Sequence, residues 1–134
     1  MCRWNVRAFL VPALTALAIS LAGASVVGGE NEFVGGTGDV PLAPGLIEDS
    51  NANVVFDSPT GRIVESYAYG EGAVADVNAF YADTLPQLGW LAVGPGVFRR
   101  EGEILRIRAT REEGAANRIV VRFSLSPDSS AAAH

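Results

Sequence analysis

The chain has 134 residues, with ten basic side chains against 15 acidic ones and a formal net charge of −5. That length fits one domain, and the acidic balance argues against nucleic acid and anionic lipid surfaces as partners. Every basic side chain is an arginine, which excludes catalysis through a Schiff-base lysine.

Residues 1–24 have the pattern of a signal peptide. Arg3 and Arg7 precede an apolar run of 14 residues, 8–21, and residues 22–24 supply the small-x-small pattern that a signal peptidase recognises. Fourteen residues is shorter than the roughly 20 that a membrane-spanning helix needs. We therefore expect cleavage after this segment, which makes the protein periplasmic or secreted with no membrane anchor.

The only cysteine, Cys2, lies before the apolar run, whereas the acylated cysteine of a lipoprotein follows it. Cleavage removes Cys2 and two arginines, which leaves eight arginines against 15 carboxylates and a net charge near −7. A mature chain without cysteine has no disulfides, so its stability depends on its hydrophobic core.

Residues 25–39 contain five glycines and no apolar period, which predicts a flexible lead-in. The segment follows no strand, precedes no helix and contains no lysine, so it matches neither a P-loop nor a dinucleotide-binding loop.

Residues 40–47, VPLAPGLI, differ from the lead-in because Pro41 and Pro44 hold an apolar segment extended. Such a segment cannot join the middle of a sheet, but it can lie across one. We expect three of its side chains to cover the part of the sheet that a helix leaves open: Leu42, Leu46 and Ile47. The alternative is that this part of the sheet is a groove for a partner, a ligand or a second copy.

Residues 73–90 predict the single helix of the domain. Apolar residues recur at steps of three and four, the spacing of one helical face: Val74, Val77, Tyr81, Leu85 and Leu88. Pro86 cannot donate the backbone bond owed to the carbonyl of Ala82, so the helix should end near Thr84 and restart as a short turn. Gly89 suits the left-handed residue that closes a helix.

Short strands are predicted on both sides of this helix. They cover residues 53–56, 62–69, 97–100, 104–111 and 118–125, and residues 90–93 form a lead-in. A two-residue loop after residue 100 sets Phe98 opposite Leu105. The sequence does not decide which face of the second strand points inward, although alternation places Tyr67 and Tyr69 on the same face as Glu65. The last strand has the clearest alternation, with four side chains on one face: Ile119, Val121, Phe123 and Leu125.

These elements predict an α+β domain over residues 40–127. It consists of a meandering antiparallel sheet of four to five strands with one helix packed on one face. Residues 128–134 follow Pro127 and predict a disordered tail that carries the only histidine, His134.

Few catalytic chemistries are available to the mature chain. Without cysteine or lysine, and with one terminal histidine, it has no Ser–His or Cys–His pair and no Cys/His zinc site. We therefore predict a non-enzymatic protein with no catalytic residue, metal site or cofactor. Two carboxylates alone can support glycoside hydrolysis, which leaves a carboxylate-based hydrolase as a distant alternative.

Four arginines are predicted on the outward face of two adjacent strands: Arg106, Arg108, Arg118 and Arg122. The functional interpretation is a site for a carboxylate or phosphate group of a partner. In the structural interpretation, the arginines pair with nearby carboxylates such as Glu103, Glu112 and Glu113. This interpretation is favoured because charged residues are common on exposed sheet faces.

Three segments give the chain a resemblance to a known group: VPLAPGL (40–46), GRIVESYA (61–68) and FYADTLPQLGW (80–90). They resemble segments of small uncharacterised exported proteins of bacteria, over roughly residues 40–125. The resemblance implies an envelope location and this fold, and it implies no activity. The helix, the Gly-Trp pair and the following hairpin also look like the α+β modules of some outer-membrane assembly lipoproteins, but the lipid-carrying cysteine is missing.

Two function classes follow from these observations. The first is a binding or scaffolding domain of the bacterial envelope, and the second is a carrier or sensor of a small apolar ligand held between helix and sheet. The partner is an unknown envelope protein or a small ligand, and the chain is expected to be a monomer or weak homodimer. A carrier needs an apolar pocket of roughly a few hundred Å³, whereas a scaffold needs an exposed patch on a filled core.

Overall fold

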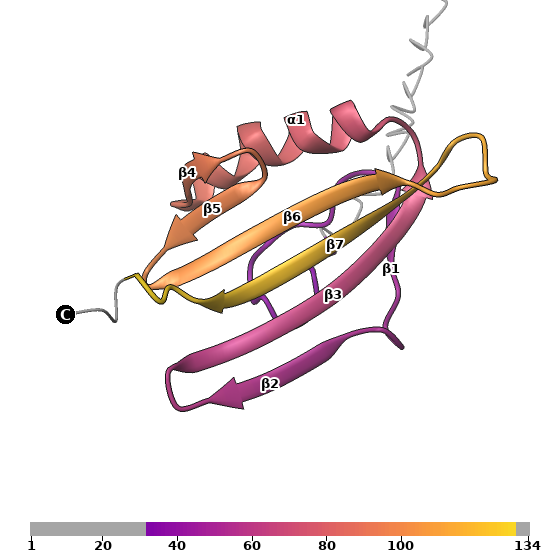
Figure 1. Cartoon of the computed structure of the whole chain (residues 1–134). Helices are drawn as coiled ribbons and strands as arrows, with labels where there is room; N and C mark the ends of the chain where they lie inside the picture. Colours follow the sequence, from indigo (N-terminus) through magenta and orange to yellow (C-terminus); the bar gives the residue numbers. More distant parts are fainter. Residues whose placement is uncertain (1–31, 131–134) are drawn as a thin grey trace, which may run out of the picture.

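Seven strands, one α-helix and a 3-10 helix make up residues 32–130, the part of the chain that this computed structural model describes (Figure 1). In chain order they are β1 (Leu46–Glu48), β2 (Val54–Ser58), β3 (Gly61–Glu71), α1 (Val74–Thr84), η1 (Leu85–Leu88), β4 (Leu91–Gly94), β5 (Val97–Arg100), β6 (Glu103–Arg111) and β7 (Arg118–Pro127). The α+β class is confirmed, but the sheet has more strands than the predicted four to five. The additional strands are β1 and β4, where the sequence predicts only a covering segment and a lead-in.

All strand pairs are antiparallel, but their order is not a simple meander. The sheet runs β1-β3-β7-β6-β5-β4, so the last strand lies between β3 and β6. The helices α1 and η1 carry the chain from β3 to the far edge, and the chain then returns strand by strand (Figure 1). At the other edge β1 and β2 share β3, because β2 pairs with residues 61–65 and β1 with residues 68–70.

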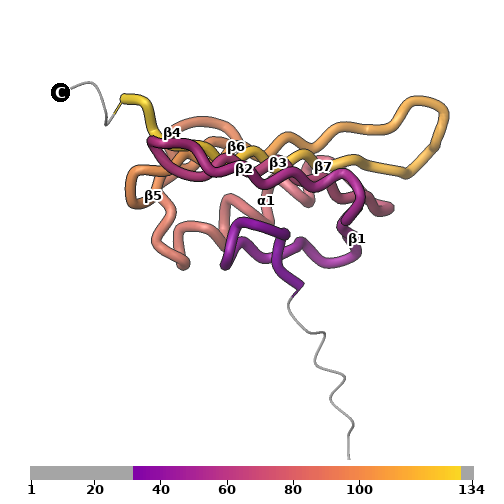
Figure 2. Tube along the Cα trace, turned by 90° about the horizontal axis from the view of Figure 1, so that it is seen from below, coloured from indigo at the N-terminus to yellow at the C-terminus, as the bar shows by residue number. Residues whose placement is uncertain are grey.

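The helix and the segment before β1 lie on the same side of the sheet (Figure 2). We call this side the covered face and the opposite side the open face. Successive side chains of a strand point to opposite faces, and the buried ones of the long strands all lie on the covered face. They are Val64, Ser66 and Ala68 on β3, Leu105 and Ile107 on β6, and Ile119, Val121, Phe123 and Leu125 on β7. The alternation predicted for the last strand is confirmed, as is the pairing of Phe98 with Leu105.

The helix follows the prediction closely. It ends at Thr84, η1 continues it for four residues with Pro86 in its first turn, and Gly89 closes it with φ 88°. The helix buries Val77 and Tyr81, and the Tyr81 ring packs edge-on against Phe123 with 5.6 Å between ring centroids.

The segment before β1, together with Leu46 at the start of β1, covers the remainder of the sheet. The predicted burial of Leu46 is confirmed, and Val40 and Ala43 are buried beside it, whereas Leu42 is only partly buried. Ile47 is 57% exposed, because alternation along β1 turns it toward the open face. The Tyr81 hydroxyl fastens this segment, since it accepts a hydrogen bond from the Ala43 N–H at 3.0 Å and donates one to the Pro41 carbonyl at 2.9 Å.

Both predicted flexible segments are corrected where the structure describes them. Val34 and Thr37, within the predicted lead-in, are each 1% exposed, so the domain begins before residue 40. Asp128, the first residue of the predicted disordered tail, is buried, donates its N–H to the Gly102 carbonyl and pairs with Arg99 at 2.7 Å. The leader and residues 131–134 lie outside the described residues.

Candidate functional site

The open face is the part of the sheet on which neither α1 nor the segment before β1 packs (Figure 2). Its side chains come from the alternate positions of the long strands. They include Glu65, Tyr67 and Tyr69 on β3, Arg106 and Arg108 on β6, and Arg118, Arg122 and Ser124 on β7. The expectation that Tyr67 and Tyr69 share the face of Glu65 is confirmed.

Three of the four predicted arginines are brought together on this face. The register of β6 and β7 places Arg108 directly opposite Arg122 and Arg106 directly opposite Ser124. Like charges directly opposite each other on one sheet face destabilise the pairing. The Arg108–Arg122 pair therefore needs compensating negative charge, which within the described residues reaches only Arg122, from Glu65.

Only one of these three guanidinium groups is neutralised within residues 32–130. Arg122 donates to Glu65 at 2.8 Å, and the Ser124 hydroxyl donates to the other oxygen of the same carboxylate at 2.7 Å. Burial opposes ionisation of Glu65, but these hydrogen bonds outweigh it and lower the pKa of Glu65, so the carboxylate stays charged. The guanidinium groups of Arg106 and Arg108 form neither a hydrogen bond nor an ion pair with any described residue.

Arg118 is separate from this group. It pairs with Glu112 at 2.8 Å, and its guanidinium lies over the Tyr69 ring at 4.8 Å from the centroid. Glu103, another of the expected partners, pairs with Arg62 at 3.0 Å. The structural interpretation therefore holds for Arg118, and for Arg122 through Glu65, whereas Glu103 and Glu112 pair with arginines other than Arg106 and Arg108.

A hollow of about 300 Å³ opens beside the three arginines. Arg106, Arg108, Arg122 and Ser124 line it, together with the turn of residues 95–96 between β4 and β5 and Val97 at the start of β5. The hollow with its three arginines, Ser124 and this turn is called the arginine site below. It offers guanidinium groups and a hydroxyl, which suits a carboxylate or phosphate group.

Sequence reasoning missed Ser124, Glu65 and the turn. Alternation alone places Ser124 beside Arg122, so that signal was available. Glu65 is 57 residues away from Arg122 in the chain, and the turn belongs to another hairpin, so their part in the site follows only from the strand order.

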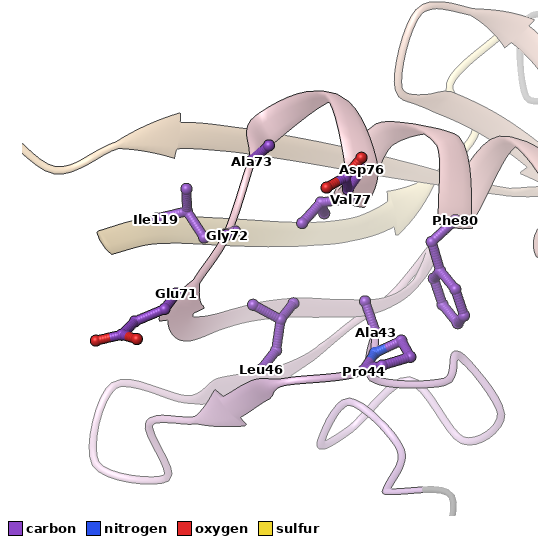
Figure 3. A pocket seen from close by; sticks show the side chains of 10 residues that line it. All are labelled: Ala43, Pro44, Leu46, Glu71, Gly72, Ala73, Asp76, Val77, Phe80 and Ile119. Atoms are coloured by element: carbon purple, nitrogen blue, oxygen red, sulfur yellow. The ribbon is translucent and has the colours of Figure 1, made fainter. Parts of the chain in front are cut away.

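A second hollow, of about 270 Å³, lies between the start of α1 and the segment before β1 (Figure 3). Its walls are mostly apolar: Ala43, Pro44, Leu46, Val77, Phe80 and Ile119. Small residues at Gly72 and Ala73 leave this space unfilled. Two carboxylates, Glu71 and Asp76, lie at its border. Figure 3 shows the Glu71 side chain pointing away from the other lining side chains. We call this hollow the apolar pocket.

Neither a metal-binding cluster nor a membrane-spanning helix is found in the described part of the chain. Among residues 32–130, no three His, Cys, Asp or Glu side chains gather closely enough to hold a metal ion. Over the same residues, no helix has the length and apolar character required to cross a membrane.

Comparison with known proteins gives no match. No family model fits the chain, and no curated protein or solved structure is similar to it.

Proposed function

We propose that the protein is an exported, non-enzymatic binding domain, and that its arginine site holds a carboxylate or phosphate group of a partner in the bacterial envelope. One observation carries this proposal: Arg106 and Arg108 have no carboxylate partner among residues 32–130, and they lie next to Arg122 across the strand pair. An anionic group on a partner would supply the missing negative charge and relieve the repulsion between Arg108 and Arg122.

Export is part of the same proposal. It is supported by the leader pattern of residues 1–24. In this view the covered face provides a filled core, and the open face works as a scaffold for the partner.

Titration with two anionic probes tests the arginine site. A hexaglutamate peptide supplies carboxylates and inorganic phosphate supplies a small dianion, and calorimetry at about 20 and 200 mM salt measures both. We expect binding to the peptide, the phosphate or both, weakened by salt because exposed charges are screened. The double variant Arg106→Gln/Arg108→Gln should lose at least tenfold in affinity.

The matched control is Arg111→Gln. This variant removes one charge from the end of the same strand, at a position whose side chain donates only to the Ala116 carbonyl. Equal losses for Arg111→Gln and for the double variant would show that net charge, and not the arginine site, attracts the probes. No binding of either probe to the unmodified protein would refute the proposal.

The second candidate function is a carrier or sensor of a small apolar ligand, and the apolar pocket favours it. A volume of about 270 Å³ is at the lower end of ligand-binding cavities. Native mass spectrometry of protein from its bacterial source, before and after heat extraction, should then show a bound mass that Ala73→Leu abolishes. Ala79→Leu, on the exposed side of the same helix, is the control. A protein that always arrives without ligand would contradict the carrier.

A further inference from the structure

The two edges of the sheet are protected to different degrees. β4 is four residues long, and its pairing with β5 shifts register between Ala92 and Gly94. Irregularities of this kind protect an edge strand from pairing with another chain. The β4 edge therefore carries one of the usual devices against association.

The β2 edge carries almost none. Its register with β3 is unbroken from Val54 to Ser58, and the strand contains neither proline nor a basic residue. Three consecutive side chains are more than half exposed: Val54 (57%), Val55 (56%) and Phe56 (59%). Among residues 32–130, no backbone hydrogen bond reaches β2 from the side away from β3. An apolar strand edge of this kind is a template for a further strand.

We propose that β2 pairs antiparallel with β2 of a second copy of this chain, with Val55 opposite Val55. The strand is self-complementary in this register. Val54 then faces Phe56 of the second copy on the open face, twice by symmetry, and each Phe56 already lies beside Ile63 of β3. Asp57, the only charge of the strand, faces Asn53 of the second copy, so no like charges meet.

The neighbouring register is less favourable. Pairing centred on Phe56 sets Val55 opposite Asp57 and Val54 opposite Ser58, so each copy would place two apolar side chains against polar ones. A two-fold axis through Val55 is therefore the arrangement that pairs apolar side chains with each other.

The small size of the interface favours a weak, transient association. Two five-residue strands and their side chains bury on the order of 1,000 Å² in total, the lower limit for specific interfaces. The proposal is therefore a weak dimer that forms at high protein concentration. The two copies repel each other through their net negative charge, so added salt should strengthen the dimer. Salt should weaken anion binding, so the two proposals respond to salt in opposite directions.

The dimer has a functional consequence that rests on the proposed arginine site. Antiparallel edge pairing has its two-fold axis perpendicular to the sheet, so both open faces look to the same side. Two arginine sites would then face one partner surface, and a partner with two anionic groups would bind more tightly than either group alone.

Cysteine cross-linking tests the register directly. The only native cysteine is Cys2, in the leader, so the processed chain offers a background without thiols. Directly opposed residues of antiparallel strands have Cβ atoms about 4.5–5.5 Å apart, close to the separation in a disulfide. Val55→Cys should therefore form a disulfide-linked dimer under mild oxidation, at least tenfold faster than Leu91→Cys. Leu91 is a fair control because it lies in the β4 edge and is 63% exposed.

Sedimentation velocity measures the oligomeric state without any introduced cysteine. The unmodified chain should shift from monomer to dimer with rising concentration, and more so at high salt. Phe56→Lys should stay monomeric with an unchanged circular dichroism spectrum. Arg106→Gln/Arg108→Gln should still dimerise at high salt, where its additional net negative charge is screened. Equal cross-linking rates for Val55→Cys and Leu91→Cys, or a Phe56→Lys variant that still dimerises, would overturn the proposal. Either result leaves the arginine site to be judged by its own titration.

Discussion

The two faces of the sheet are built from the same strands, yet one carries buried apolar side chains and the other carries exposed charged ones. On β7 the covered face presents Phe123 and Leu125, both almost completely buried, while the alternate positions present Arg122 and Ser124 to the open face. Burying a large apolar side chain stabilises a domain by about 1.5–3 kcal/mol. An exposed ion pair contributes about 1 kcal/mol or less. Stability therefore depends on the covered face, which leaves the open face available for binding.

Substitution of Phe123 should show the largest difference between the faces. Phe123→Ala leaves a cavity beneath the Tyr81 ring and should lower the free energy of unfolding by about 3–5 kcal/mol. Arg122→Gln, one position away on the open face, should cost far less because its side chain is largely exposed. Urea unfolding measures both variants. Equal losses would mean that the open face also supports the fold.

Removal of single tyrosine hydroxyls gives a finer comparison. Tyr81→Phe deletes the hydrogen bonds to Ala43 and Pro41 and leaves a buried backbone N–H unpaired, at a cost of about 1–3 kcal/mol. Burial raises the pKa of Tyr81, so its hydroxyl stays neutral over the ordinary pH range. Tyr67→Phe, on the open face, should leave the unfolding free energy within about 0.5 kcal/mol. If Tyr81→Phe had the same unfolding free energy as the unmodified protein, the segment before β1 would be held by apolar contacts alone.

How much of this comparison could be predicted from the sequence depends on how local each contact is. The alternation of β7 and the Pro86–Gly89 helix end are local patterns, and both are confirmed. Alternation also places Arg106, Arg108 and Arg122 on one face. Which of them lacks a partner could not be predicted, because Glu65 reaches Arg122 only where β7 inserts between β3 and β6.

The burial of Val34 and Asp128 could not be predicted from the sequence either. Glycine-rich composition and chain ends are typical of flexible segments, but composition does not record long-range contacts. Val34 belongs to the hydrophobic core, and Asp128 reaches Arg99 of β5.

Acid should reveal a smaller contribution from the covered side of the domain. Arg100 donates to both oxygens of Asp39 at 2.7 and 2.8 Å, and these hydrogen bonds lower the pKa of Asp39 despite the opposing effect of burial. A carboxyl with a lowered folded pKa adds stability above its ordinary value of about 3.9, and that stability is lost as pH falls through the folded pKa.

Asp39→Asn should therefore lower the unfolding free energy at pH 7 by less than about 1 kcal/mol, because the Asp39 side chain is half exposed. The difference from the unmodified protein should shrink as pH falls below about 4. Urea unfolding between pH 2.5 and 7 measures it. A difference that stays constant over this range would show that the ion pair does not account for the loss.

The smallest expected change in stability comes from the arginine site itself. Arg108→Thr removes the repulsion from Arg122 and should raise the unfolding free energy by about 0.3 kcal/mol. A site selected for stability would not behave in this way. Loss of stability in Arg108→Thr would indicate that Arg108 has a structural role.

Residue-by-residue mapping of anion binding tests the central claim most directly. Amide chemical shifts of the isotope-labelled protein are recorded while hexaglutamate is added. The account predicts that the shifted amides cluster around the arginine site, at Arg106, Arg108, Arg122 and Ser124 and at Gly96 and Val97. Shifts confined to the apolar pocket, or scattered over every arginine of the chain, would contradict it.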